Sequence, residues 1–109
     1  LHDHLDYSGV LLVAGGSVEA RHYEFVDWAR RDEPEVELRE THHLRLGPGA
    51  VATLGRRRDN LHDVVAGPEG AYLIDVFTHD HDRSRSREFR LEPQTDGSDP
   101  RVHRATRLD

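Results

Sequence analysis

The stretch VELRETHHLRL, residues 36–46, alternates apolar and polar side chains over most of its length. Successive side chains of a β-strand point to opposite faces, so a period of two is typical of a half-buried strand. We therefore predict a strand over 36–46 with one face turned to the core. The residues expected on that face are Val36, Leu38, His42, Leu44 and Leu46.

Glycine and proline divide the rest of the chain into segments of strand length. Gly15-Gly16 and Gly67-Pro68-Glu69-Gly70 predict hairpin turns, and the charged stretch 27–35 predicts a loop or a single helical turn. The nearly continuous apolar run 71–78 predicts a central strand. Further strands are expected at 1–13, 17–25, 50–54 and 88–91. This pattern predicts an all-β barrel or sandwich.

Length and composition narrow the class of protein. A chain of 109 residues supports one domain with one core, expected over residues 1–93 and followed by a polar C-terminal tail at 94–109. The net charge of −6 argues against a nucleic-acid partner. There is no cysteine and no apolar run of about 20 residues, so we expect no disulfide, no thiolate ligand and no membrane span. With no signal-peptide pattern, a soluble cytoplasmic protein is expected.

Three of the nine histidines form an arrangement suited to metal binding. His2 and His4 are separated by one residue on an expected strand, so both imidazoles project from one face. His62, which follows a polar turn, could supply a third ligand from a neighbouring strand. The alternative is that His2 and His4 are simply polar residues on a strand face.

Other polar clusters are weaker candidates for chemistry. His79-Asp80-His81 is a rival metal site, although a solvated loop suits its charged surroundings better. His22, His42 and His43 are expected to be structural or surface residues. The run Arg56-Arg57-Arg58 is expected to be a solvated turn.

The order of these motifs resembles the cupin superfamily. More narrowly, Leu1-His2-Asp3-His4, Asn60-Leu61-His62 and Ile74-Asp75-Val76-Phe77 resemble the plant cysteine oxidase and aminoethanethiol dioxygenase family, over roughly residues 1–78. The resemblance implies an antiparallel double-stranded β-helix barrel. The chain begins directly at the motif, so we expect the N-terminal strands of that barrel to be missing.

The resemblance also implies a ligand set. Cupins often place a glutamate ligand four or five residues after the second histidine, where this chain has Ser8 and Gly9. The implied site is therefore the three histidines of the thiol dioxygenases, holding Fe(II), although three histidines also suit zinc. The family's Pro-Pro-Tyr is replaced by Thr78-His79-Asp80, and its downstream cysteine and tyrosine have no counterpart near Phe89.

The implied function is iron-dependent oxidation of a small thiol, or of an N-terminal cysteine, by dioxygen to a sulfinate. Asp75 would contact the substrate amine, unless it is a buried aspartate satisfied by the backbone. A cupin of another activity (an isomerase, a hydrolase or a small-ligand sensor) and a non-catalytic truncated cupin are the alternatives. An exposed sheet edge would favour a homodimer. Since ligand imidazoles must be neutral, metal loss is expected below a pH of about 6.5.

Overall fold

The computed structural model describes residues 1–4, 8–78, 86–95 and 97–108. The fold is all-β and antiparallel, as predicted, with one short 3₁₀ turn at Trp28–Arg30 in the stretch expected to hold a loop or helical turn. None of the described helical residues forms a helix long and apolar enough to cross a membrane. The strands are β1 Gly9–Phe25, β2 Glu35–Leu46, β3 Val51–Leu54, β4 Leu61–Phe77, β5 Glu88–Leu91 and β6 Val102–Leu108.

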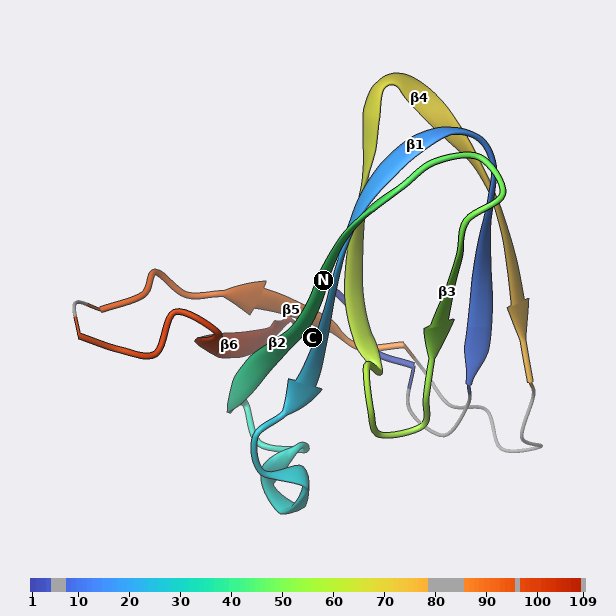
Figure 1. Ribbon diagram of the computed structural model, residues 1–109. Coiled ribbons are helices and arrows are strands. Elements are labelled where there is room, and N and C mark those ends of the chain that lie inside the picture. The colour runs from blue at the N-terminus through green and yellow to red at the C-terminus, as the bar shows by residue number, and fades with distance from the viewer. Residues whose placement is uncertain (5–7, 79–85, 96, 109) are drawn as a thin grey trace.

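Strands β1 and β4 pair along most of their length and bend together into an arch, against which β3 lies (Figure 1). The two expected hairpins at Gly15-Gly16 and at 67–70 are therefore wrong. The register shifts between Val13 and Gly15 and between Gly16 and Val18, and Gly16 has a φ of 69°. Glycines that accept such angles let a strand bulge and bend without ending.

Strand β2 confirms the predicted strand over 36–46 but switches faces in its middle. Tyr23 pairs with Glu40 and His22 pairs with His42, which leaves Thr41 as an extra residue in a bulge. Val36 and Leu38 consequently face one side of the sheet, while Leu44 and Leu46 face the other. The predicted residues are buried or partly buried except His42, which is exposed.

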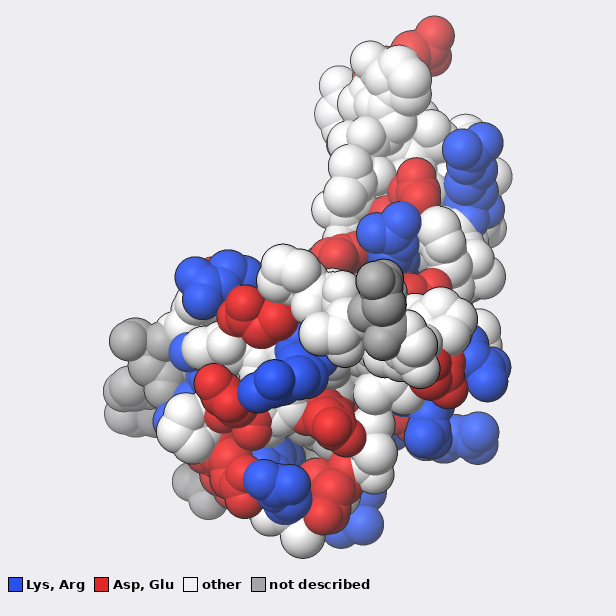
Figure 2. Space-filling view, turned by 90° about the vertical axis from the view of Figure 1, so that its left-hand side faces the viewer, with Lys and Arg blue, Asp and Glu red and all other residues white. Residues whose placement is uncertain are grey.

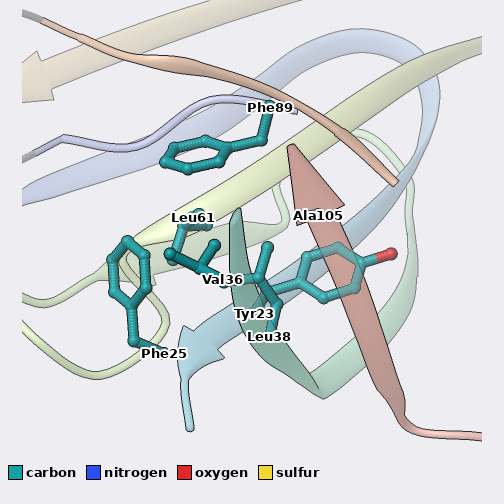
Figure 3. Close-up of a cluster of buried hydrophobic side chains, with 7 residues drawn as sticks. All are labelled: Tyr23, Phe25, Val36, Leu38, Leu61, Phe89 and Ala105. Atoms are coloured by element: carbon teal, nitrogen blue, oxygen red, sulfur yellow. The ribbon is translucent and has the colours of Figure 1, made fainter. Parts of the chain in front are cut away.

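Two apolar clusters lie on opposite faces of the sheet, where a single core was expected. The first surrounds Leu61 (Figure 3), and Leu1 and Trp28 pack against its margin. The second lines the inner side of the arch. Its buried members are Leu11, Val13, Val18, Ala20, Leu46 and Ala52.

The polar tail expected at 94–109 is wrong for residues 102–108. Strand β6 pairs with β2 and β5, and Ala105 is buried in the first cluster. Because β6 lies between two neighbours, it forms backbone hydrogen bonds on both edges, which a count of its apolar residues does not reveal. The domain therefore extends past residue 93.

The sheet is not closed into a barrel, and its strand order is β3-β1-β2-β6-β5 with β4 on the other edge of β1. Residues 71–77 pair only with β1 among the described strands, and residues 72–77 are exposed. The expected central strand is therefore an outer one. At the other end of β4, isolated bridges place His2 between His62 and Glu88, so the N-terminal residues lie between β4 and β5.

Candidate metal centre

The structure brings together the three histidines that the sequence singled out. His2 and His4 come from the N-terminal segment, and His62 comes from the start of β4, which that segment bridges. The Nε2 atom of His62 lies 3.1 Å from Nε2 of His4 and 3.0 Å from Nε2 of His2. One ligand atom of each histidine falls within 4.8 Å of the others.

This spacing fits a metal ion. Two nitrogens that bind one metal at about 2.1 Å and at right angles lie about 3.0 Å apart. Hydrogen bonds alone explain the cluster less well, because the Nε2 of a neutral imidazole carries either one proton or one lone pair. The Nε2 of His62 could therefore complete a good hydrogen bond with only one of its two neighbours, whereas a cation can accept all three lone pairs.

Burial keeps these imidazoles neutral at physiological pH, as metal ligands must be. Burial, together with the smaller effect of the neighbouring imidazoles, lowers the pKa of His4 to about 4 and that of His62 to about 3. Burial also lowers the pKa of His2, with nearby carboxylates, including Asp75, acting in the opposite direction. The site is therefore ready to bind a cation without first losing protons.

A buried ion pair holds the His2-Asp3-His4 segment in place. Asp3 is fully buried on the face opposite the two ligands, and its carboxylate accepts hydrogen bonds from the backbone N–H and the Nε–H of Arg87. The Arg87 guanidinium also contacts Asp32. Burial raises the pKa of Asp3, and the bonds from Arg87 counteract that rise. No sequence pattern pointed to Arg87, because its role depends on its position just before β5, across from Asp3.

Asn60 fixes the second ligand. Its side chain is fully buried, accepts a hydrogen bond from the backbone N–H of His4 and donates one to the backbone carbonyl of His4. The same amide group also donates to the carbonyl oxygens of Gly55 and Arg56. The turn before β4 and the first ligand pair are thereby tied together through one side chain.

Asp75 is close enough to act on the pKa of His2, and it is exposed, so the alternative of a buried, backbone-satisfied aspartate is wrong. Asp75 and Phe77 share one face of β4 because they are two residues apart. The Phe77 ring stacks on the His4 ring with centroids 4.9 Å apart. An aromatic ring and a carboxylate thus border the histidine cluster, and sequence reasoning had assigned no role to Phe77.

The remaining candidates are placed as follows. His79-Asp80-His81 lies outside the described residues. His43 contacts Glu19, while His22 and His42 share the face of the metal cluster. Arg56, Arg57 and Arg58 are exposed, as expected of a solvated turn, and the Arg57 guanidinium lies over the Trp28 ring.

Comparison with known proteins adds no relatives to this description. No protein-family model matches the chain, and no curated protein matches it at a significant level. The functional argument therefore depends on the site itself.

Proposed function

We propose that this chain is a cupin that binds Fe(II) through His2, His4 and His62 and oxidises a small thiol or an N-terminal cysteine to a sulfinate. The observation that carries the proposal is the convergence of three imidazoles, of which His4 and His62 are buried and His2 is partly buried, with the pKa of each lowered. The motif resemblance supplies the choice of iron and of a thiol. The antiparallel all-β fold supports a cupin. The sheet described above would form only part of a cupin barrel.

The reaction consumes one thiol and one dioxygen and releases a sulfinate and a proton. Two sulfur–oxygen bonds form, the oxygen–oxygen and sulfur–hydrogen bonds break, and the four electrons lost by sulfur are gained by dioxygen. When bound, a divalent iron held by three neutral ligands keeps its full charge, favours the thiolate and brings the two reactants together.

The chain's own residues would position the substrate. Asp75 offers a carboxylate for a substrate amine, and Phe77 covers one side of the His4 ring. On the face shown in Figure 2, acidic and basic side chains are interspersed, which supports a small-molecule substrate over nucleic acid. A soluble cytoplasmic protein fits this proposal.

Metal analysis of purified protein tests the ligand set. We expect about one iron per chain in the native protein and almost none in His62→Ala. The control His42→Ala removes a half-exposed histidine from the same face and should keep its metal. Equal loss in both variants would contradict the three-histidine site, and zinc in place of iron would favour a hydrolytic cupin.

Oxygen uptake by the iron-loaded protein tests the reaction. We expect uptake that depends on cysteine, cysteamine or a peptide with N-terminal cysteine, and sulfinate as the product. Asp75→Asn should raise KM for these amine-bearing thiols about tenfold and leave iron content unchanged, since a hydrogen bond to a charged group contributes about 1.5 kcal/mol or more. Iron-loaded protein that shows no thiol-dependent uptake would rule out this function and favour a cupin of another activity or a non-catalytic one.

A further inference from the structure

A row of four imidazoles crosses the sheet and includes two of the proposed metal ligands. His2 bridges His62, His62 pairs with His22, and His22 pairs with His42. Directly paired residues of neighbouring strands point to the same face. The ring of His22 accordingly lies 6.0 Å from that of the ligand His62 and 6.1 Å from that of His42.

His22 differs from its neighbour in the row in the contacts of its ring. It is only 3% exposed, and among the described residues the hydrogen bond at His22 is one that its backbone carbonyl accepts from Thr41, while its ring contacts only the neighbouring imidazoles. His42, in contrast, is half-exposed and its Nδ1 lies 3.1 Å from the Asp59 carboxylate. A neutral imidazole has one donor and one acceptor to offer. The ring nitrogens of His22 are not among the enclosed polar atoms that lack a partner in the described residues, so they stay open to a small molecule.

The His22 ring lies next to the ligand His62 on the same face of the sheet. Asp75 borders the same cluster on the side of the arch near His2. A substrate that contacts both Asp75 and His22 needs an amine for Asp75 and a hydrogen-bond acceptor for His22. Cysteamine has an amine and a thiol but no carbonyl oxygen, whereas cysteine and N-terminal cysteinyl groups have all three.

We propose that His22 is a substrate-binding residue that donates a hydrogen bond to the carbonyl or carboxyl oxygen of an α-amino thiol held at the three-histidine centre. The identity of the ligand rests on the proposed function, while the role of His22 follows from its burial and its place in the row. His22 thereby distinguishes α-amino thiols with a carbonyl group from simple aminothiols.

Anaerobic binding to cobalt-substituted protein tests this without turnover. Cysteine methyl ester and cysteamine are titrated separately, with the thiolate–cobalt absorption band as the readout. His22→Leu should weaken binding of the ester about fivefold to tenfold, the effect of one lost hydrogen bond, and change cysteamine binding less than twofold. His22→Gln, which keeps an N–H donor, should recover part of the difference. The control His42→Leu should leave both affinities unchanged.

The outcomes separate the two proposals. An unchanged ratio of ester to cysteamine affinity in His22→Leu would overturn the role of His22, even if the native protein oxidises thiols. A changed ratio in a protein that never oxidises them would support His22 and overturn the proposed function. Native protein that binds no cobalt would overturn both. Cobalt content and thermal unfolding of each variant show whether the fold is intact, and His22→Gln serves if His22→Leu does not fold.

Discussion

Burial of His62 favours metal binding but makes protonation of the folded chain unfavourable. Its imidazole is buried among other imidazoles, which lowers its pKa to about 3, although a surface histidine would titrate near 6.5. A buried neutral imidazole is a good metal ligand, but without a metal it makes the folded chain resist protonation. The metal site should therefore be visible in the pH dependence of stability even in the metal-free protein.

The metal-free protein is expected to lose stability as the pH falls from about 6.5 towards 4. In that range the unfolded chain binds protons at His4 and His62 that the folded chain does not, so the free energy of unfolding rises with pH and is fully developed above 6.5. Urea unfolding at pH 7.5, 6 and 5 measures this change in the free energy of unfolding. Each unit by which the pKa differs between the folded and the unfolded chain contributes at most about 1.4 kcal/mol.

The variant His62→Leu provides the comparison, because it removes one titrating group and leaves the background from other residues. Its stability should vary less with pH than that of the native chain. Identical pH profiles would contradict the depressed pKa of His62. The same shifts move the expected loss of metal from folded protein to well below the pH of 6.5 that free histidine would suggest.

At the scale of elements, β2 shows what alternation can and cannot predict. Period-two patterning identified Val36, Leu38 and Leu46 as buried residues correctly. It could not reveal that Thr41 forms a bulge, because a bulge is defined by the register with the partner strand. The strand therefore contributes to two cores, and the same bulge aligns His42 with His22 beside the metal centre.

Strand β6 is the element whose role is most easily tested. Ala105 is buried against the first cluster, where Glu would place an unpaired charge, whereas its neighbour Arg104 is exposed on the opposite face. Ala105→Glu should destabilise the fold by several kcal/mol. Arg104→Glu serves as a control. It removes only an exposed ion pair with Glu35, so it should change the free energy of unfolding by less than about 1 kcal/mol. Urea unfolding that finds Ala105→Glu as stable as the native chain would show that β6 is not part of the folded core.

Over the whole molecule, the sequence alone predicted the all-β class and placed the three histidines that the structure brings together. Two histidines one residue apart must share a strand face, so local geometry sufficed for His2 and His4. The sequence could not predict the supporting residues Arg87 and Asn60, because they contact Asp3 and His4, which are distant from them in the chain. Gly15-Gly16 also misled the prediction, since a glycine pair fits a hairpin and a bent strand equally well.

The arch leaves an apolar area on its outer side, which we call the outer apolar face. Register places its members on one side of β3, β1 and β4, and most are exposed, with Val76 at 62%. The residues of this face are Val10, Leu12, Val51, Tyr72, Ile74 and Val76.

A second copy of the chain is the occupant that we expect for this face. Contiguous exposed apolar area on a polar chain marks an interface, and two such faces can pack sheet against sheet with no charge in either to repel the other. Light scattering behind a sizing column should show a dimer that dissociates on dilution. Val76→Lys should give a monomer, because it would bury an ammonium group between the two sheets.

The matched control is Val65→Lys. Val65 lies in the same strand and is also 62% exposed, but it is surrounded by Glu19, Arg21 and Asp63 and lies outside the outer apolar face. The variant Val65→Lys should leave the dimer intact. A native chain that stays monomeric at high concentration, or a dimer that both lysine variants disrupt equally, would show that self-association does not use this face. Because Val76 lies between Asp75 and Phe77, the metal content of Val76→Lys should be measured as well, so that a disturbed site is not taken for a lost interface.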